Sequence, residues 1–235
     1  MRDRVLSFGG EVIPAKIGSD PKIIRAVRKV TVTQVAGSNR EIVDMQNAWE
    51  CYDQPYTLYI GDGKEDSIQE PLMKVASVLY KEGWQVLIDD YEPDIFRLAY
   101  YAGGFEADNR HTRLSKFDVV FRCRPERFLI SGNIPVAVQN NTIISNATAF
   151  DAKPLIHIEG SGDVTFTIAG QTFAVNGMVD YINIDTDKMD VYRLAAENKN
   201  SMFSGVFPVL KTGNNLITYT GNITAATIIP RFWVI

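Results

Sequence analysis

Apolar and polar residues alternate along much of this chain, and that period of two predicts β-strands. In the first half, residues 29–33 alternate around Val30 and Val32, and residues 42–49 follow after the turn-forming residues 37–39. This pattern predicts a β-hairpin. Further strands are predicted at residues 84–88, 95–107 and 112–124, with a turn at residues 108–110 joining the last two.

One segment of the first half has helical spacing instead. Pro71 suits a first helical turn, Asp66 or Ser67 can cap it, and Gly83 can end it. The apolar positions that recur at helical spacing are Leu72, Val75, Ala76 and Leu79. We therefore predict a β-rich first half with one α-helix.

The second half shows only short alternating segments, separated by Gly, Asn and Asp. This spacing is typical of an antiparallel β-sandwich. The glycine-rich residues 160–162 are interpreted as a hairpin loop. The predicted strands are residues 154–159, 164–169, 171–176, 181–185, 190–194, 215–220 and 224–229.

Charged residues are distributed unevenly between the two halves. Residues 1–127 carry 18 basic and 20 acidic side chains, whereas residues 128–235 carry 6 and 8. We predict two domains, residues 1–127 and 128–228, with the junction near residues 126–134. The low charge of the second half has two interpretations: Thr, Asn and Ser form an ordinary solvent face, or much of that face contacts a partner.

Composition excludes several classes of protein. The 235 residues are 46% hydrophobic and 22% charged, with a net charge of −4, so disorder and sequence-independent nucleic-acid binding are disfavoured. No apolar run is long enough to cross a bilayer, and the N-terminus does not resemble a signal peptide. We expect a soluble protein that does not insert into membranes.

Candidate chemical sites are few. Asp185, Asp187 and Asp190 resemble the start of a calcium loop, but the glycine and glutamate that complete such a loop are missing. Residues 89–94 hold four carboxylates that could bind a metal or supply an acid–base pair. Both segments lie between predicted strands, so turns are the favoured interpretation.

The remaining reactive side chains point to no known catalytic motif. Cys51 and Cys123 are expected to be buried free thiols. His157 lies on a strand and His111 in a polar turn, and neither has a recognisable nucleophile nearby. We predict no catalytic, metal-binding or cofactor-binding residues, and a β-dominated assembly or binding protein that is not an enzyme.

The order of motifs along the chain resembles the distal tail protein (Dit) family of bacteriophages with long, non-contractile tails. Each motif is short, but together they cover most of the chain. They are the segments 35–39, 49–52, 87–90 with Pro93, 117–125, 152–162, 207–208, 213–215 and 229–233, together with the single helix.

The resemblance implies a hexameric ring formed by the first domain around a channel that continues the tail tube. The second domain would be a galectin-like sandwich, and the C-terminal segment 229–235 would pack back on the first domain through Pro230, Phe232 and Trp233. The hairpin at residues 28–50 is the candidate wall of the channel, with a mildly acidic surface past which DNA could slide. The candidate ring and channel residues are Val30, Val32, Gly37, Ser38, Asn39, Arg40 and Trp49.

By the same resemblance, the chain would be a structural hub at the tail tip of the virion, assembled in the host bacterial cytoplasm. Its partners would be other copies of itself, the tail tube protein, a tail-associated lysin or tail-tip protein, and receptor-binding proteins. The sequence lacks the His, Asn, Arg and Trp set with which galectins bind sugars, so a galectin-like fold does not imply that activity.

Two other functions stay open from the residues alone. A carbohydrate-binding module could contact host cell-wall glycans through an aromatic platform, with Tyr181, Tyr192 and Tyr219 as the candidate stacking residues. A hydrolase would need a carboxylate pair such as Asp89 and Asp94 in a cleft.

Overall fold

The computed structural model describes residues 4–61, 68–111, 114–194 and 197–235. The chain forms two compact units: unit 1 is residues 1–127 with Ile235, and unit 2 is residues 128–234. The described residues contain no helix with the length and apolar character that crossing a lipid bilayer requires. The predicted fold class, mainly β with one helix in the first half and an antiparallel sandwich in the second, is confirmed.

Six strands of unit 1 form a closed β-barrel in the order β9-β5-β2-β1-β6-β7, and β7 pairs back with β9 to close it. The sequence analysis missed the hairpin β1–β2, although Gly9 and Gly10, both with positive φ, form its turn. The strands are β1 (Val5–Phe8), β2 (Glu11–Ile17), β5 (Tyr52–Ile60), β6 (Gln85–Asp89), β7 (Ile95–Tyr100) and β9 (Leu114–Leu129).

Three predicted boundaries in unit 1 were wrong. Strand β7 ends at Tyr100 rather than at residue 107, and residues 108–110, predicted as a turn, belong to strand β8 (Asp108–His111) beside β9. Strand β9 also continues to Leu129. The glycines at 103 and 104 interrupt the alternation that had seemed to extend the earlier strand, since glycine weakens a strand interior.

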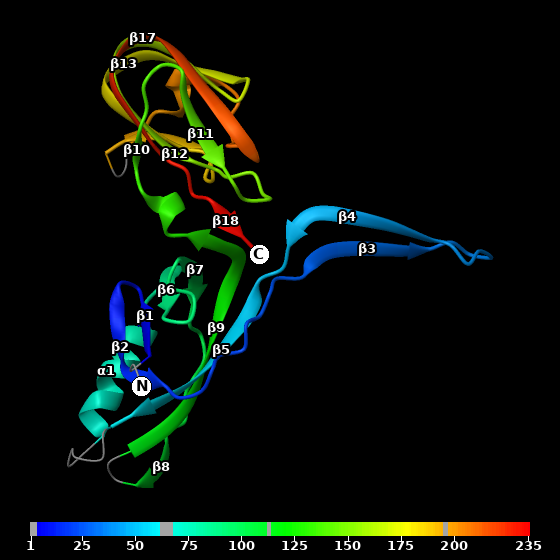
Figure 1. Cartoon of the computed structure of the whole chain (residues 1–235), viewed down its shortest axis with the longest axis vertical. Helices are drawn as coiled ribbons and strands as arrows, with labels where there is room; N and C mark the ends of the chain where they lie inside the picture. The colour runs from blue at the N-terminus through cyan, green and yellow to red at the C-terminus, as the bar shows by residue number, and fades with distance from the viewer. Residues whose placement is uncertain (1–3, 62–67, 112–113, 195–196) are drawn as a thin grey trace. The chain divides into compact units, whose positions relative to one another are not determined.

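The predicted helix is present as α1 (Gln69–Leu79), which lies beside β2 (Figure 1). It buries Val75, Val78 and Leu79 against the barrel core. Its predicted caps, Asp66 and Ser67, fall outside the described residues.

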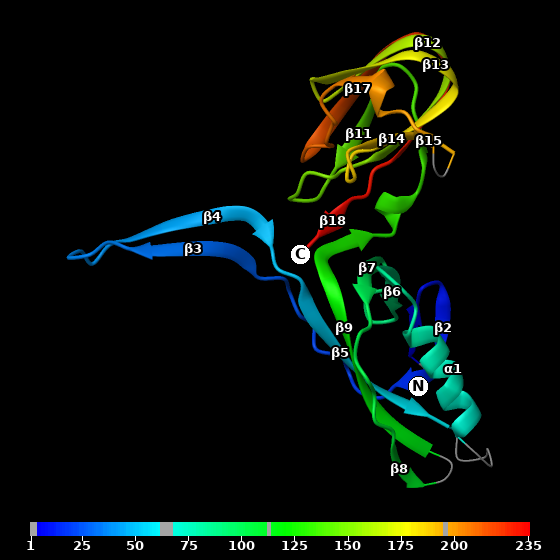
Figure 2. The same ribbon diagram turned by 180° about the vertical axis from the view of Figure 1, so that it is seen from behind.

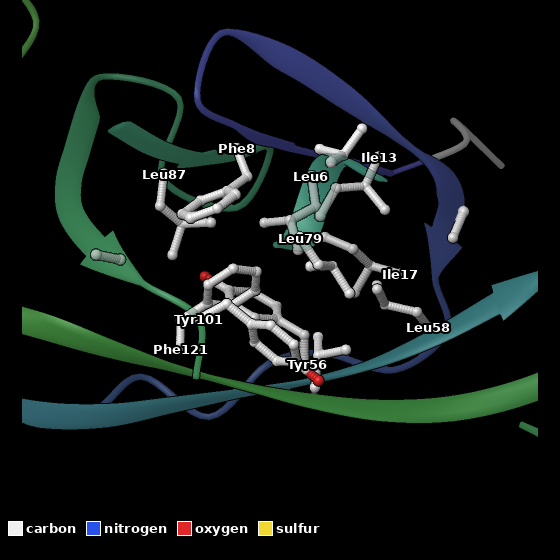
Figure 3. Packing of buried hydrophobic residues seen from close by; sticks show 14 of the residues in the cluster. Leu6, Phe8, Ile13, Ile17, Tyr56, Leu58, Leu79, Leu87, Tyr101 and Phe121 are labelled. Carbon is white, nitrogen blue, oxygen red and sulfur yellow. The ribbon is translucent and has the colours of Figure 1, made fainter. Parts of the chain in front are cut away.

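The barrel core is aromatic as well as aliphatic. Figure 3 shows the rings of Tyr56, Tyr101 and Phe121 gathered together, with Phe8, Leu79 and Leu87 above them in this view. The centroid of the Phe121 ring lies 5.0 Å from that of Phe8 and 5.6 Å from that of Tyr101. Alternate residues of β5 point into this core, which is the pattern of a strand with one buried face.

The same barrel also contains a network of buried charged side chains. Asp89 and Arg97 are only 2% and 3% exposed, and Arg97 Nη1 donates to Asp89 Oδ2 at 3.0 Å. The Tyr56 hydroxyl donates to the same oxygen at 2.6 Å. Glu92 pairs with both Arg97 and Arg127. Burial raises the pKa of Tyr56 despite the opposing charge of Arg97, so Tyr56 stays a neutral donor.

Unit 2 is built on three long antiparallel strands, β12 (Leu155–Ile168), β13 (Gln171–Asp185) and β17 (Gly213–Ile229). Figures 1 and 2 show them bending together. The sheet order is β10-β17-β12-β13-β14-β15, with β11 beside β17 and β16 beside β13. The shorter strands are β10 (Val136–Ala137), β11 (Thr142–Asn146), β14 (Asp190–Arg193), β15 (Glu197–Asn198) and β16 (Phe203–Gly205).

These long strands correct the sequence analysis, which divided each of them into two. Residues 160–162 are not a hairpin loop but an irregular stretch within β12, where the register shifts against β17. Glycine is required there, because a Cβ on Gly160 would lie 2.1 Å from the carbonyl oxygen of Asn222. Along β13 the buried side chains lie first at odd-numbered positions, Phe173 and Val175, and from Met178 on mainly at even-numbered positions. In the sequence, this shift in phase resembled the end of one strand and the start of another.

The C-terminal segment is attached to unit 2 by a buried ion pair. Arg231 donates to both carboxylate oxygens of Asp185, at 2.7 and 3.1 Å, and its backbone N–H donates to Gly132. Burial opposes the charge of Asp185, but the hydrogen bonds and charge of Arg231 outweigh it and lower the pKa of this carboxyl. Phe232 accepts a backbone hydrogen bond from Leu129 through its carbonyl group.

We expect Asp89→Asn to lower the free energy of unfolding by about 3 kcal/mol, because it leaves Arg97 buried with only part of its partner charge. The control is Asp94→Asn, an exposed position in the same turn, where we expect a change within about 0.5 kcal/mol. Urea unfolding monitored by tryptophan fluorescence measures both. Equal effects of the two substitutions would contradict a stabilising role for the network.

We expect Arg231→Gln to lower the free energy of unfolding by about 2 kcal/mol at neutral pH, since Asp185 then stays charged, buried and unpaired. Folding lowers the pKa of Asp185, so the ion pair stabilises above the ordinary value of about 4 and this contribution is lost as the pH falls below it. The difference between wild type and variant should therefore shrink below about pH 4.

Unfolding curves recorded at a series of pH values measure this dependence. The control is Lys211→Gln, an exposed cation of the same unit, which should follow the wild type throughout. A constant difference between Arg231→Gln and the wild type from neutral to acidic pH would show that Asp185 is not the partner that matters.

Candidate assembly surface

The predicted hairpin is present as β3 (Arg28–Gln34) and β4 (Glu41–Trp49), and within the described part of the chain these strands pair only with each other. It extends beyond the barrel strands β5 and β9 in both views (Figures 1 and 2). Residues 29–46 are all exposed. An isolated two-stranded sheet is marginally stable in water, so this element lacks the support that the other strands of unit 1 have.

One face of the hairpin is apolar. The register pairs Val30 with Met45 and Val32 with Val43, and paired residues of an antiparallel sheet share a face. These four side chains are 45% to 61% exposed. They form a continuous apolar patch, which we call the hairpin patch.

The opposite face is mainly polar. It carries Thr31 opposite Asp44 and Thr33 opposite Ile42. The Gln46 side chain donates to the Thr31 hydroxyl at 3.1 Å on this face. The hairpin is therefore amphipathic, although neither face is covered within the described residues.

The sequence analysis named Val30 and Val32 but missed Val43 and Met45. The missing information is the strand register, which pairs each valine of β3 with an apolar residue of β4. Counting outward from the predicted turn at residues 37–39 would not have found them, because it places Val32 opposite Asp44, and the observed register differs from this by one residue.

The other candidate ring residues lie at the two ends of the hairpin. Gly37 has φ of 74° in the turn, and the Arg40 N–H donates to the Ser38 hydroxyl at 3.1 Å, so the tip has a defined conformation. Trp49 lies at the base, where it packs against the barrel core with the Arg28 guanidinium 5.8 Å from its ring centre. Asn39 is exposed beside the turn.

The C-terminal candidates lie within unit 2. Pro230 is buried, and Phe232 and Trp233 pack against the unit 2 core. Trp233 stacks on Phe150 at 4.3 Å between ring centroids, and its indole N–H donates to the carbonyl of Asp151. Ile235 packs against the unit 1 core. The interdomain packing expected of Pro230, Phe232 and Trp233 stays a prediction.

The candidate carboxylates are held by structural partners. Asp89 and Glu92 belong to the buried arginine network, and Asp185 binds Arg231. Asp185 Oδ1 also accepts from the backbone N–H groups of residues 187 and 188, which is the turn expected there. Among the described residues, no group of three or more His, Cys, Asp and Glu side chains is placed to hold a metal ion.

The two cysteines and His157 occupy different environments. Both cysteines are free thiols, but only Cys123 is buried, and Cys51 is half-buried. Burial raises the pKa of Cys123 to about 12, which makes this thiol a poor nucleophile. His157 lies on the outer face of β12, with its ring nitrogens 2.8 Å from Asn183 Oδ1 and 3.2 Å from Glu159 Oε1. The side chain of His111 is outside the described set.

Comparison by sequence gives no relatives: no family model matches the chain, and no curated protein does. Comparison by structure does. The crystal structure of the SPP1 Dit (gp 19.1) protein, described as a paradigm of the hub adsorption apparatus in phages that infect Gram-positive bacteria, matches with a TM-score of 0.74 and 11% sequence identity. The match covers 96% of this chain and 97% of that one.

Two structures of the phage P2 baseplate in its activated conformation match as well. The calcium form gives a TM-score of 0.56 and the strontium form 0.52, each at 11% identity over 96% of both chains. At this level of identity the likeness concerns the fold. The fold of this chain, over nearly its whole length, is therefore similar to that of the SPP1 distal tail protein.

Proposed function

We propose that this chain is the structural hub of a phage tail tip. It forms a homohexameric ring that joins the tail tube to the tail-associated lysin or tail-tip protein and carries the receptor-binding components. The observation that carries the proposal is the shared fold, which extends over nearly the full length of both this chain and the SPP1 hub protein. The hub catalyses no reaction, because its role is to hold other proteins in place.

The hairpin patch supplies the contact between neighbouring copies. An amphipathic two-stranded sheet gains stability when its apolar face is covered, and full burial of each valine or methionine contributes about 1.5–3 kcal/mol. A contact between the hairpin of one copy and the barrel of the next is heterologous, and such contacts close into a ring when the rotation between copies is fixed.

The polar face of the hairpin then lines the channel. Thr31, Thr33 and Asp44 are compatible with a water-filled passage. The mildly acidic wall expected from the overall charge needs correction, since residues 28–50 carry three basic and three acidic side chains. A wall without net charge neither binds DNA tightly nor repels it strongly, which suits a passage through which DNA slides.

Val32→Glu tests the ring directly. Burying an unpaired carboxylate costs several kcal/mol, so this substitution should convert the oligomer to monomers at micromolar concentration. The matched control is Thr33→Glu, one residue along on the polar face, which should keep the oligomer. Size-exclusion chromatography with light scattering measures both masses.

Both positions are exposed in the single chain, so the thermal unfolding of the two variants should match that of the wild type. A wild-type protein that is monomeric at all concentrations and absent as a hexamer from tail tips would overturn the ring. Loss of the oligomer in both variants alike would assign the contact to a surface other than the hairpin patch.

A further inference from the structure

The outer face of unit 2 carries a group of polar and aromatic side chains that the hub role does not use. The register places His157 opposite Asn183, and Glu159 opposite Tyr181. Tyr192 of β14 lies opposite Asn183 on the other side. Three neighbouring strands thus bring these side chains to one face of the sheet, and none of them is buried. We call this set the β12–β14 face.

These side chains hold one another in place. His157 bridges Asn183 and Glu159 through its two ring nitrogens, at 2.8 and 3.2 Å, and its ring centroid lies 5.4 Å from that of Tyr181. The Arg193 guanidinium lies 5.5 Å from the centre of the same tyrosine ring. A face that is ordered before binding loses less conformational entropy when a ligand arrives.

Hydrogen-bonding groups remain available on this face. Within the described residues, no hydrogen bond engages the Tyr181 hydroxyl or the Asn183 side-chain nitrogen. The neighbouring strand β17 adds only the short side chains of Ala225 and Thr227 beside Glu159 and His157. The face therefore offers a donor, carboxylate and hydroxyl oxygens and an aromatic ring within a few residues of one another.

This combination matches the chemistry of a sugar. A pyranose has an apolar C–H face that packs on an aromatic ring, and hydroxyls that both donate and accept hydrogen bonds. The charged side chains at and beside this face narrow the class of ligand. Arg193 pairs with Asp180 at 3.1 Å, and Glu159 adds a second carboxylate, so carboxylates outnumber arginines here. A polyanion is disfavoured here.

We propose that the β12–β14 face binds a neutral saccharide, with Tyr181 as the aromatic surface and Asn183 and Glu159 as hydrogen-bonding partners. This differs from the aromatic set expected from the sequence, because Tyr219 stacks on Phe166 at 5.0 Å and packs against the unit 2 core. The proposal goes beyond the hub role, since the ring contact is assigned to unit 1 and this face belongs to unit 2.

The test uses the full chain on an array that carries neutral hexose, deoxyhexose and N-acetylhexosamine glycans beside glycans with uronic acids or phosphate. A neutral glycan that binds is then titrated by saturation-transfer difference NMR. We expect Tyr181→Ala and Asn183→Ala each to weaken its binding about tenfold, the size of effect that one aromatic or hydrogen-bonded contact supplies.

The matched control for Tyr181→Ala is Tyr80→Ala, which removes an exposed tyrosine of unit 1 and should leave binding unchanged. Thermal unfolding and light scattering of each variant separate loss of the sugar site from loss of the fold or of the ring. Three results would overturn the proposal: no neutral glycan binds, acidic glycans bind more tightly, or binding survives both substitutions on the β12–β14 face.

Discussion

Closure of the barrel through β9 is the constraint on which the rest of unit 1 depends. This strand pairs with β5 along nine residue pairs and also with β7, so both edges of the sheet end on one segment of chain. A closed sheet has no free edge, and its interior must be filled by side chains that fit. The aromatic cluster fills it, and the buried Asp89–Arg97 pair is stabilised there because the Tyr56 hydroxyl and Glu92 add further hydrogen bonds to it.

The hairpin β3–β4 takes no part in this closed barrel. The other strands of unit 1 for which burial is described contribute side chains to the core or pair within the barrel sheet. The side chains of residues 29–46, in contrast, are all exposed. Ordering such a segment costs conformational entropy that its own contacts do not recover. The contact with a neighbouring copy proposed above would explain why apolar residues alternate with polar ones here as regularly as in a half-buried strand. The same alternation made the hairpin easy to predict from sequence, but it carried no information about what covers it.

Local patterns predicted the hairpin, the helix and the turn around residues 186–188, because short-range alternation, Pro71 and turn residues decide these elements. They did not predict closure of the barrel or the continuity of β12, β13 and β17. Both depend on partners far away in sequence: the carbonyl of Asn222 leaves no room for a Cβ at Gly160, and buried Arg127 is paired with Glu92. The sequence named Tyr181 and Tyr192 as candidate stacking residues but did not bring them together with His157, since Tyr181 is 24 residues from His157 along the chain and only the strand register places both on one sheet face.

The structure also bears on the low charge of the second half. Four of its six basic side chains form ion pairs inside unit 2, Lys153, Arg193, Lys199 and Arg231 with Asp187, Asp180, Glu197 and Asp185. Such pairs cancel much of the field that the unit would project, so long-range electrostatic steering contributes little to its encounters. If unit 2 binds the saccharide proposed above, recognition would rely on short-range hydrogen bonds and shape. That is the regime in which an uncharged ligand competes best with the many charged molecules around a cell surface, because a weak field offers those molecules no advantage.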